Sequence, residues 1–361
     1  MNSNKLKNLL HIGLSLAVTI ACLYFAFQKI SMEDILQTTN EINWGVVVIV
    51  SVMALVAIAL RAWRWSYILK PITTLPIGKL FNITMIGFMA NNVLPAHAGE
   101  LVRAFLLSKK GKISFFAVTS TILIERLFDG VTLVILLVSV LFFIDGPAWL
   151  QYGSITATAV VISALVFLAL LASEKSKLRK FILNLVEKIP GKLRGKVKPR
   201  VKAFIFGLDI LKDWTLMTPV LLLSIFIWLF MGATVFIILN SFPIHQYVDL
   251  NIGLFSMTTV ILLALAIVIP SSPGYIGVTQ FVFITTFGLF VNMDTVASIA
   301  KGYILNGSVI FNLTQYIPIT LFGIILLFKE GLSLKSLNIK KEKLPVVPPI
   351  PGKIDVQPDF E

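Results

Sequence analysis

The sequence is poor in the residues that metal sites, disulfides and soluble surfaces require. Cys22 is the one cysteine among 361 residues, which excludes an intramolecular disulfide and a cysteine-based metal site. The three histidines, His11, His97 and His245, are far apart and match no metal-binding motif. Charged residues make up only 14% of the chain, whereas soluble domains contain about 25%. No ATP-binding loop occurs either, so we expect no metal or nucleotide cofactor.

What the sequence does contain is a large excess of apolar residues. They account for 57% of the chain, and the mean hydropathy is +0.90, which together predict an integral membrane protein. Lysine and arginine number 31 against 18 acidic residues, for a net charge of +13. In a membrane protein this excess is typical of cytoplasmic loops beside anionic lipid, so we do not expect nucleic acid as a partner.

Apolar runs predict an all-α polytopic membrane protein. Six of them serve as candidate helices across about 30 Å of hydrocarbon, at residues 9–27, 44–60, 113–144, 154–172, 219–239 and 303–328. Lys5 and Lys7 precede the first run, as basic residues precede the apolar part of a signal peptide. This run is longer than a typical signal sequence and no small-residue cleavage site follows it. We therefore expect a retained helix, with cleavage as the alternative.

Two further hydrophobic regions are interrupted by polar residues, proline and glycine. Residues 81–107 are broken at 91–100, and residues 252–291 are broken at 270–277. Basic residues flank the first region on both sides, whereas the second begins and ends beside loops without a basic excess. We therefore expect about six spanning helices plus two re-entrant hairpins that enter from opposite faces, in an inverted-repeat-like arrangement. The alternative is a pair of kinks in spanning helices.

Charge also predicts the orientation. Basic flanks place both termini on the inner side of the cytoplasmic membrane. Residues 173–213 hold twelve Lys and Arg against four Asp and Glu, and Phe181, Leu185 and Ile189 recur at helical spacing. This pattern predicts either an amphipathic helix on the anionic inner leaflet or a solvated basic loop. We assign the transmembrane domain to residues 1–330 and expect the basic, proline-rich tail, 331–361, to be disordered.

Ionisable residues inside two apolar segments are the strongest indication of a site. Each charge at a helix centre costs about 2.5–3.5 kcal/mol on insertion scales unless partners or water receive it. Glu125 and Asp129 share a helix face beside Arg126, and Glu100 and Arg103 share a face of the first broken segment. We interpret them as lining a polar cavity in which arginines bind a lipid phosphate and acids balance charge or relay protons. The alternative is a set of purely structural ion pairs.

The breaks themselves favour binding of an anion. Pro273, Gly274 and Gly277 permit a sharp turn and a close backbone approach. Helices that begin within the two hairpins can aim their N-terminal amides at a phosphate. The sequence thus predicts that both hairpins contribute to one site.

Four blocks of residues carry a family resemblance. They are Arg61-x-x-Arg64-Trp65, Asn92-x-Leu94-Pro95-x-x-x-Gly99-Glu100-x-x-Arg103, Glu125-Arg126-x-x-Asp129 and Pro270-x-x-Pro273-Gly274-x-x-Gly277. In this order they resemble the lysylphosphatidylglycerol synthase transmembrane-region family, over nearly the whole chain up to Phe328. The resemblance implies a flippase-like helical bundle. In the best understood members it implies movement of an aminoacylated phospholipid between leaflets.

Two departures from the family limit what the resemblance implies. Only a short tail follows Phe328, so we expect no soluble aminoacyl-transferase domain and no aminoacyl transfer. The family pattern Pro-Gly-Gly-x-Gly-x-x-Glu ends here in Gln280, which lacks the negative charge of glutamate and suggests a different head group. The candidate lipid-binding residues are Asn92, Glu100, Arg103, Glu125, Arg126, Asp129, Pro273, Gly274, Gly277 and Gln280.

The leading hypothesis is a lipid transporter or flippase for an anionic or modified phospholipid, which includes aminoacylated ones. Its expected partners are that phospholipid and either a second copy of the chain or a separate lipid-modifying enzyme. One alternative is a membrane enzyme or accessory subunit in lipid modification or lipid-linked sugar metabolism, with Glu125 and Asp129 as paired carboxylates. A second alternative is a membrane scaffold with structural charge pairs.

Overall fold

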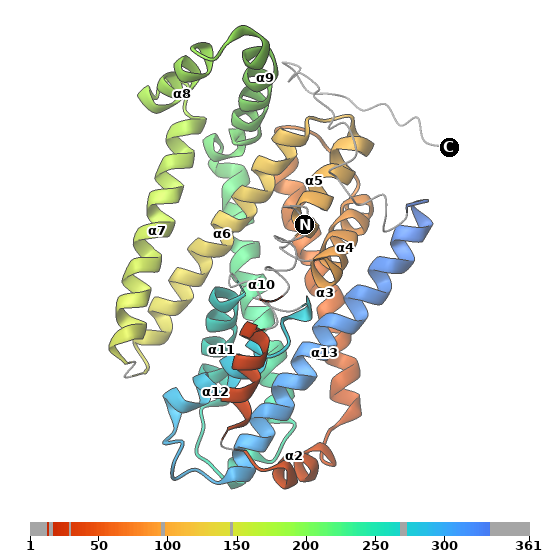
Figure 1. Ribbon diagram of the computed structural model, residues 1–361, viewed down its shortest axis with the longest axis vertical. Coiled ribbons are helices and arrows are strands. Elements are labelled where there is room, and N and C mark those ends of the chain that lie inside the picture. The colour runs from red at the N-terminus through yellow and green to blue at the C-terminus, as the bar shows by residue number, and fades with distance from the viewer. Residues whose placement is uncertain are drawn as a thin grey trace.

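The computed structural model describes residues 13, 17–28, 30–94, 98–144, 147–267 and 273–332, and the regular structure in these ranges is helical. Within them, four helices are long and apolar enough to cross a membrane: α3 (Trp44–Leu69), α7 (Ala148–Ala172), α10 (Trp214–Asn240) and α13 (Ser298–Lys329). A fifth, α6 (Phe115–Leu141), has 27 residues, a rise of about 40 Å, but carries charges at its centre. The prediction of an all-helical polytopic membrane protein is confirmed (Figure 1). The first expected run is a helix over its described part, Ala17–Phe27.

The two broken regions are pairs of short antiparallel helices. One pair is α4 (Ile77–Val93) with α5 (Ala98–Gly111), and the other is α11 (Ile252–Ala266) with α12 (Val278–Phe290). Helices of 13 to 17 residues rise about 20–25 Å, which is less than the hydrocarbon thickness of about 30 Å. The pairs occupy opposite halves of the molecule (Figure 1), and the short η3 (Pro273–Tyr275) contacts α4. Insertion of the pairs from opposite membrane faces stays a prediction.

Parts of both breaks lie outside the described residues. These parts are residues 95–97, which include Pro95, and residues 268–272, which include Pro270. The predicted tail, from residue 333 onward, and most of the first sixteen residues lie outside them as well.

A glycine contact holds the two arms of the first hairpin together. A Cβ added to Gly99 of α5 would lie 1.9 Å from the carbonyl oxygen of Gly87 of α4. The side-chain oxygen of Asn91 accepts a hydrogen bond from the Gly99 N–H at 2.8 Å, which satisfies one free amide at the start of α5. A Cβ on Gly87 would lie 2.2 Å from Cγ of Arg103. This close approach fixes α5, and with it the side chains of Glu100 and Arg103.

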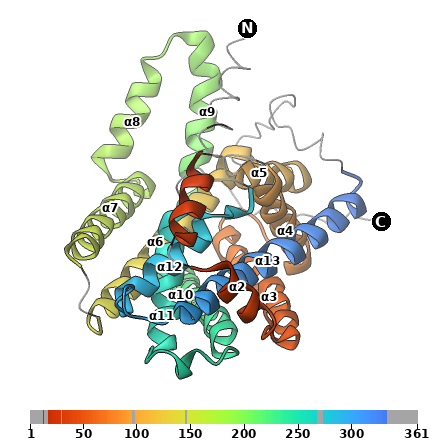
Figure 2. The same cartoon turned by 60° about the horizontal axis from the view of Figure 1, so that its bottom comes forward.

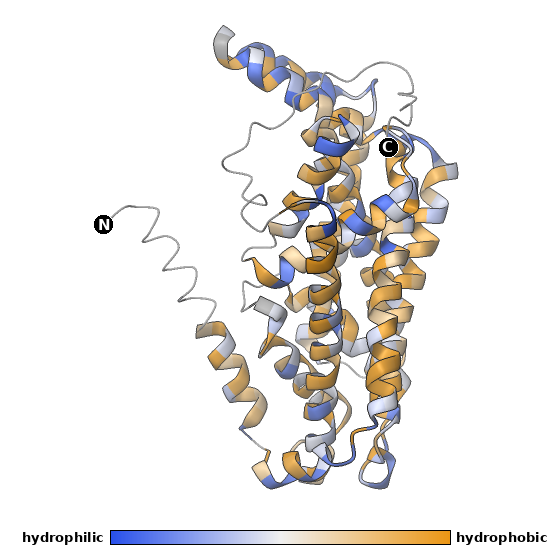
Figure 3. Ribbon diagram, turned by 90° about the vertical axis from the view of Figure 1, so that its right-hand side faces the viewer, coloured by the Kyte–Doolittle hydropathy of each residue, from blue (hydrophilic) through white to orange (hydrophobic). Residues whose placement is uncertain are grey.

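The two ends of the molecule differ in charge. The helix α2 (Met32–Thr39), with two acids in its first turn, lies at one end. The basic stretch forms α8 (Lys177–Glu187), α9 (Gly191–Gly207) and the short η1 (Asp209–Lys212), with α8 and α9 at the opposite end (Figures 1 and 2). Figure 3 shows hydrophilic residues gathered there, beyond the apolar lengths of the long helices.

The predicted amphipathic segment is helical over α8, which exposes Phe181 and Leu185; Ile189 follows the end of this helix. Contact of this surface with anionic lipid stays a prediction, as does the cytoplasmic position of the basic end and of both termini.

Charged residues lie where two apolar clusters meet. One cluster takes Trp65 from α3 and Val220 from α10, together with buried residues of α4, α5, α6, α7 and α9. The other takes Val50 from α3 and Val235 from α10, with buried residues of α11, α12 and α13. The helices α3 and α10 therefore run through both clusters, and Arg61 of α3 and Ser224 of α10 lie between the residues that these helices give to the two clusters. This junction is the place where α6 presents its charges.

Candidate functional site

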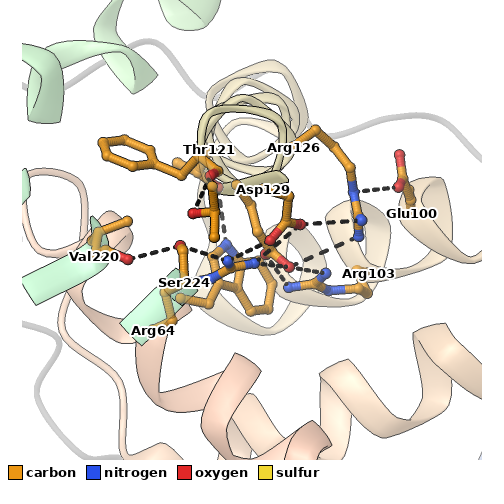
Figure 4. Close-up of polar contacts among 12 residues, drawn as sticks. Arg64, Glu100, Arg103, Thr121, Arg126, Asp129, Val220 and Ser224 are labelled. Carbon is orange, nitrogen blue, oxygen red and sulfur yellow. Dashed lines mark hydrogen bonds and ion pairs between the residues drawn. The ribbon is translucent and has the colours of Figure 1, made fainter. Parts of the chain in front are cut away.

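The carboxylate of Glu125 on α6 is completely buried and is shared by two arginines, Arg64 and Arg103, which Figure 4 labels. Arg103 of α5 donates to both of its oxygens, at 2.9 Å from Nη2 and 3.3 Å from Nη1. Arg64 of α3 approaches its Oε1 to 3.1 Å through Nη2. The two-point contact from Arg103 is the geometry in which arginine binds carboxylate most strongly. Glu125 therefore connects α3, α5 and α6.

Asp129 extends the same network to α10. Its Oδ1 accepts hydrogen bonds from Nη1 of Arg64 at 2.6 Å and from Nε1 of Trp228 at 3.2 Å. Arg64 Nη1 also donates to the hydroxyl of Ser224 at 2.7 Å, and Arg126 Nη1 donates to Oδ2 of Asp129 at 3.3 Å. We call Arg64, Arg103, Glu125 and Asp129 the buried network, because each of the four is less than 5% exposed.

Arg64 was absent from the candidate residues predicted from the sequence, and the reason is specific. The apolar run 44–60 and the positive-inside rule favour a basic cytoplasmic flank at Arg61 and Arg64. The expected end of the helix at residue 60 is wrong, whereas the side of the membrane stays a prediction. The helix α3 continues to Leu69, and both arginines are buried within it. Their spacing of three residues, with Trp65 following, was the available signal, because it puts two cations on one face of a helix.

Aromatic rings support the arginines of this region. The guanidinium of Arg103 lies over the ring of Trp65, with 4.3 Å between Cζ and the ring centre. The indole N–H of Trp65 in turn donates to the hydroxyl of Thr121 on α6 at 3.1 Å. Stacking of this kind stabilises a desolvated cation and fixes the plane of its donors.

Glu100 and Arg126 form the more accessible part of the cluster. Nε of Arg126 lies 2.8 Å from Oε1 of Glu100, and their side chains are 37% and 33% exposed. The pair lines a partly open cavity of about 180 Å³, whose lining residues are Glu100, Leu101, Thr119, Ile122, Leu123, Arg126 and Phe204. Leu101 and Leu123 are themselves exposed on the outside of the bundle. The cavity thus connects an ion pair with the lateral surface between α5 and α6.

Two of the remaining candidate residues, Asn92 and Gly274, contact a second polar group, on α13. Asn92 at the end of α4 donates to the hydroxyl of Thr320 at 2.9 Å and to the carbonyl of Tyr316 at 3.4 Å. Asn312 donates to the carbonyl of Gly274 at 2.7 Å. The ring of Tyr316 also faces Gly274, where an added Cβ would lie 2.7 Å from it. Both hairpins are therefore attached to one segment of α13.

The turn of the second hairpin depends on backbone conformations that glycine favours. Gly274 and Gly277 have φ angles of 75° and 87°, and Tyr275 between them has 58°. Pro273 begins η3. Gln280 is buried, and its side-chain oxygen accepts a hydrogen bond from the Gly277 N–H at 2.7 Å. Gln280 therefore closes the start of α12, a task that a neutral amide performs well.

The ion pairs of this cluster limit the acid–base and metal chemistry that its side chains can perform. Both buried carboxylates, Glu125 and Asp129, are held by arginines, so neither is placed as a free acid or base. Within the described ranges, histidine, cysteine and acidic side chains form no group of three that could hold a metal ion. The cluster is built to hold charge and, at Arg126, to offer it to the cavity.

A polytopic helical membrane protein with a buried arginine–carboxylate network beside a pair of short helices is the class that this fold and site define. The chain belongs to the lysylphosphatidylglycerol synthase TM region family, which matches residues 12–323. A UPF0104 membrane protein of Methanothermobacter thermautotrophicus is 23% identical over 305 residues, which cover 79% of this chain and 87% of that protein. A UPF0104 membrane protein of Methanocaldococcus jannaschii is 28% identical over 242 residues, covering 66% and 92%. The expected family is thereby confirmed.

Proposed function

We propose that this protein moves an anionic phospholipid between the leaflets of the cytoplasmic membrane. In this proposal the lipid head group replaces the carboxylate of Glu100 as the partner of Arg126. The observation that carries the proposal is the half-exposed Glu100–Arg126 pair at the wall of an otherwise mostly apolar lateral cavity. A guanidinium at this position can bind a lipid phosphate with two parallel hydrogen bonds.

The energetic contrast within the cluster favours exchange at this one pair. An ion pair that is accessible to solvent contributes only about 0–1 kcal/mol, and Arg126 keeps a second carboxylate in Asp129, at 3.3 Å. Breaking the buried pairs of Glu125 would cost about 3–5 kcal/mol, because a charge would remain buried without a partner. A phosphate therefore displaces Glu100 far more easily than it displaces Glu125.

The size of the cavity fits a head group whose acyl chains stay in the bilayer. Its volume of about 180 Å³ is below the range of about 300–1,000 Å³ that encloses a whole small ligand. Leu101, Ile122, Leu123 and Phe204 form apolar walls beside the ion pair. A lipid would place its phosphate at Arg126 and its chains outside, against the exposed leucines.

The hairpins supply the moving parts in this proposal. They enter from opposite faces, with both chain termini in the cytoplasm, and both attach to α13. Glu100 and Arg103 lie on α5, so a shift of the first hairpin alters the cavity and the buried network together. The family name supports lipid as the substrate class. Gln280, buried and neutral, gives no support to a lysyl head group in particular.

A leaflet-resolved assay in liposomes tests the proposal. Purified protein should accelerate transbilayer equilibration of a labelled phosphatidylglycerol, and Arg126→Gln should slow it about tenfold or more, as expected for a charge-assisted hydrogen bond. Glu100→Gln should act oppositely on affinity, lowering the half-saturating lipid fraction by up to about fivefold, because the competing carboxylate is gone.

Lys110→Gln is the matched control, because it breaks a comparably exposed ion pair, with Glu330, outside both the cavity lining and the basic segment 173–213. Equal rates for Arg126→Gln and the control would refute the proposal.

A further inference from the structure

We infer that Arg61 forms a second anion-binding site, which takes a phosphate group at the contact of α3, α4 and α10. The inference rests on the proposed lipid function for the source of that phosphate, a lipid head group. The position of the site follows from the structure alone. An arginine guanidinium would also accept free inorganic phosphate.

The charges around Arg61 set it apart from its neighbours. Arg64, Arg103 and Arg126 each have a carboxylate oxygen within 3.3 Å. Arg61 is 7% exposed, and within the described part of the chain it has neither an ion pair nor a hydrogen bond. It is therefore a buried cation whose donors are unmatched.

The surroundings of Arg61 hold the guanidinium without neutralising it. Its Cζ lies 5.4 Å from the ring centre of Phe88 on α4 and 5.7 Å from that of Trp228 on α10. Such contacts stabilise a cation but leave the N–H donors at the edge of its plane unused. A planar fork of donors between aromatic rings suits two oxygens of one phosphate.

The charge balance of the cluster points to the same ligand. Four arginines (Arg61, Arg64, Arg103 and Arg126) stand against three carboxylates (Glu100, Glu125 and Asp129), which leaves one positive charge uncompensated. A buried charge without a partner is strongly unfavourable inside a membrane protein. A phosphodiester carries one negative charge and would neutralise the cluster.

The position of Arg61 also connects it with the lateral cavity. Arg61 lies one helical turn before Arg64, Arg64 binds Asp129, and Asp129 binds Arg126. Phe88 directly follows Gly87, where α4 touches α5. A phosphate at Arg61 would thus occupy the far end of a chain of contacts that begins at the cavity, beside the hairpin arm proposed to move.

Direct binding measurements test this site without reference to transport. Isothermal titration of the protein in neutral detergent would use two probes, inorganic phosphate and dioctanoyl phosphatidylglycerol. Arg61→Gln should weaken binding of the lipid at least tenfold. Arg61→Lys, which keeps the charge but loses the planar fork, should weaken it by a smaller factor. Lys70→Gln is the control, because the Lys70 ammonium also lies over an aromatic ring, that of Tyr67 at 4.4 Å, and lies outside the basic segment 173–213.

The outcomes separate the sources of phosphate and the two proposals. Loss of binding of both probes in Arg61→Gln would show a site open to free phosphate, and loss for the lipid alone would assign it to the head group. Unchanged affinity for both probes in Arg61→Gln and Arg61→Lys would overturn the inference. Arg61-dependent binding without any transbilayer movement would leave the site intact and remove only the proposed function.

Thermal stability in anion-poor buffer gives an independent readout. Arg61→Gln removes an uncompensated buried charge, so its melting temperature should rise or stay level. Arg103→Gln removes the partner of a buried carboxylate and should lower it. A fall in Arg61→Gln as large as that in Arg103→Gln would make Arg61 a structural residue and contradict the inference.

Discussion

Substitution of Glu125 by glutamine tests how much the buried network stabilises the protein. Glutamine keeps the size of the side chain and one carbonyl acceptor, but it removes the negative charge between Arg64 and Arg103. Glu125 is fully buried, and its oxygens lie 2.9 Å and 3.1 Å from these two guanidinium groups. Arg64 retains Asp129, whereas Arg103 loses the carboxylate that the described residues give it. Breaking one buried pair in this way costs about 3–5 kcal/mol.

The partly exposed pair of Glu100 and Arg126 is the reference for this loss in the free energy of unfolding. Glu100→Gln should reduce the free energy of unfolding by no more than about 1 kcal/mol, because its ion pair with Arg126 is accessible to solvent. The Glu125→Gln loss of about 3–5 kcal/mol corresponds to a fall in melting temperature on the order of 4–7 °C for a chain of 361 residues. Thermal unfolding of detergent-solubilised variants, followed by tryptophan fluorescence, measures both.

A double-mutant cycle shows whether the effect comes from the pair itself. Removing Arg103 as well, in Glu125→Gln/Arg103→Gln, eliminates the unpaired cation and should recover about 1–3 kcal/mol relative to the sum of the single changes. Equal destabilisation by Glu125→Gln and Glu100→Gln, or strict additivity in the cycle, would refute the distinction between a buried network and an exchangeable pair.

Four other substitutions probe separate parts of the structure. Gly99→Ala should destabilise the first hairpin by about 1–3 kcal/mol or more, because the new Cβ meets a carbonyl oxygen of α4; Gly195→Ala, in open space on α9, should not. Hydrogen bonds from two serine hydroxyls lower the pKa of Asp34. The stability that these bonds give is therefore complete above about pH 4 and is lost as the pH falls further. Hydrogen exchange in α2 should show this pH dependence, and Asp34→Asn should abolish the pH dependence. Phe181→Ser should reduce contact of α8 with nanodiscs that contain phosphatidylglycerol, measured by quenching from labelled lipid, and equal quenching in neutral nanodiscs would contradict an anionic partner. Gln280→Glu should keep the hydrogen bond from the Gly277 N–H at the start of α12 but lose up to about 2.5–3.5 kcal/mol of stability, because the new charge is buried. It should increase the relative transport of lipids with cationic head groups.

The overall fold follows from properties that a sequence displays locally. Long apolar runs predicted the spanning helices, and the polar breaks at residues 91–100 and 270–277 marked where paired short helices meet. These signals are local because hydrophobicity and backbone freedom act on each segment by itself. The end of α3 was harder to predict. An arginine that follows a membrane helix and one buried inside it look alike in sequence, so the apolar run 44–60 does not reveal that α3 continues through Arg61 and Arg64 to Leu69.

Long-range partners could not be read from the sequence. The contact between Arg64 and Glu125 joins residues 61 positions apart, counted from their numbers, and it depends on how α3 and α6 pack. The polar side chains of α13 were hidden within an apparently continuous apolar run, because Asn312 and Thr320 do not interrupt its hydropathy. They nevertheless bind both hairpins, through Gly274 and Asn92. Sequence therefore identified the acids and two of the arginines of the site, but neither Arg61 and Arg64 nor the helix that organises its two hairpins.

The charged residues of the site fall into two groups, one that stabilises the fold and one that is available to bind a ligand. A membrane protein that handles an anionic head group needs cations at low dielectric, and unpaired cations destabilise the fold. Here Glu125 and Asp129 neutralise two arginines permanently, while Arg126 shares a carboxylate at the cavity and Arg61 lies against two aromatic rings. The stability of the helix bundle then rests on the first group, and binding can change the second group without unfolding it. Substitutions of Glu125 or Asp129 should consequently change the free energy of unfolding, whereas substitutions of Arg126 or Arg61 should change lipid binding.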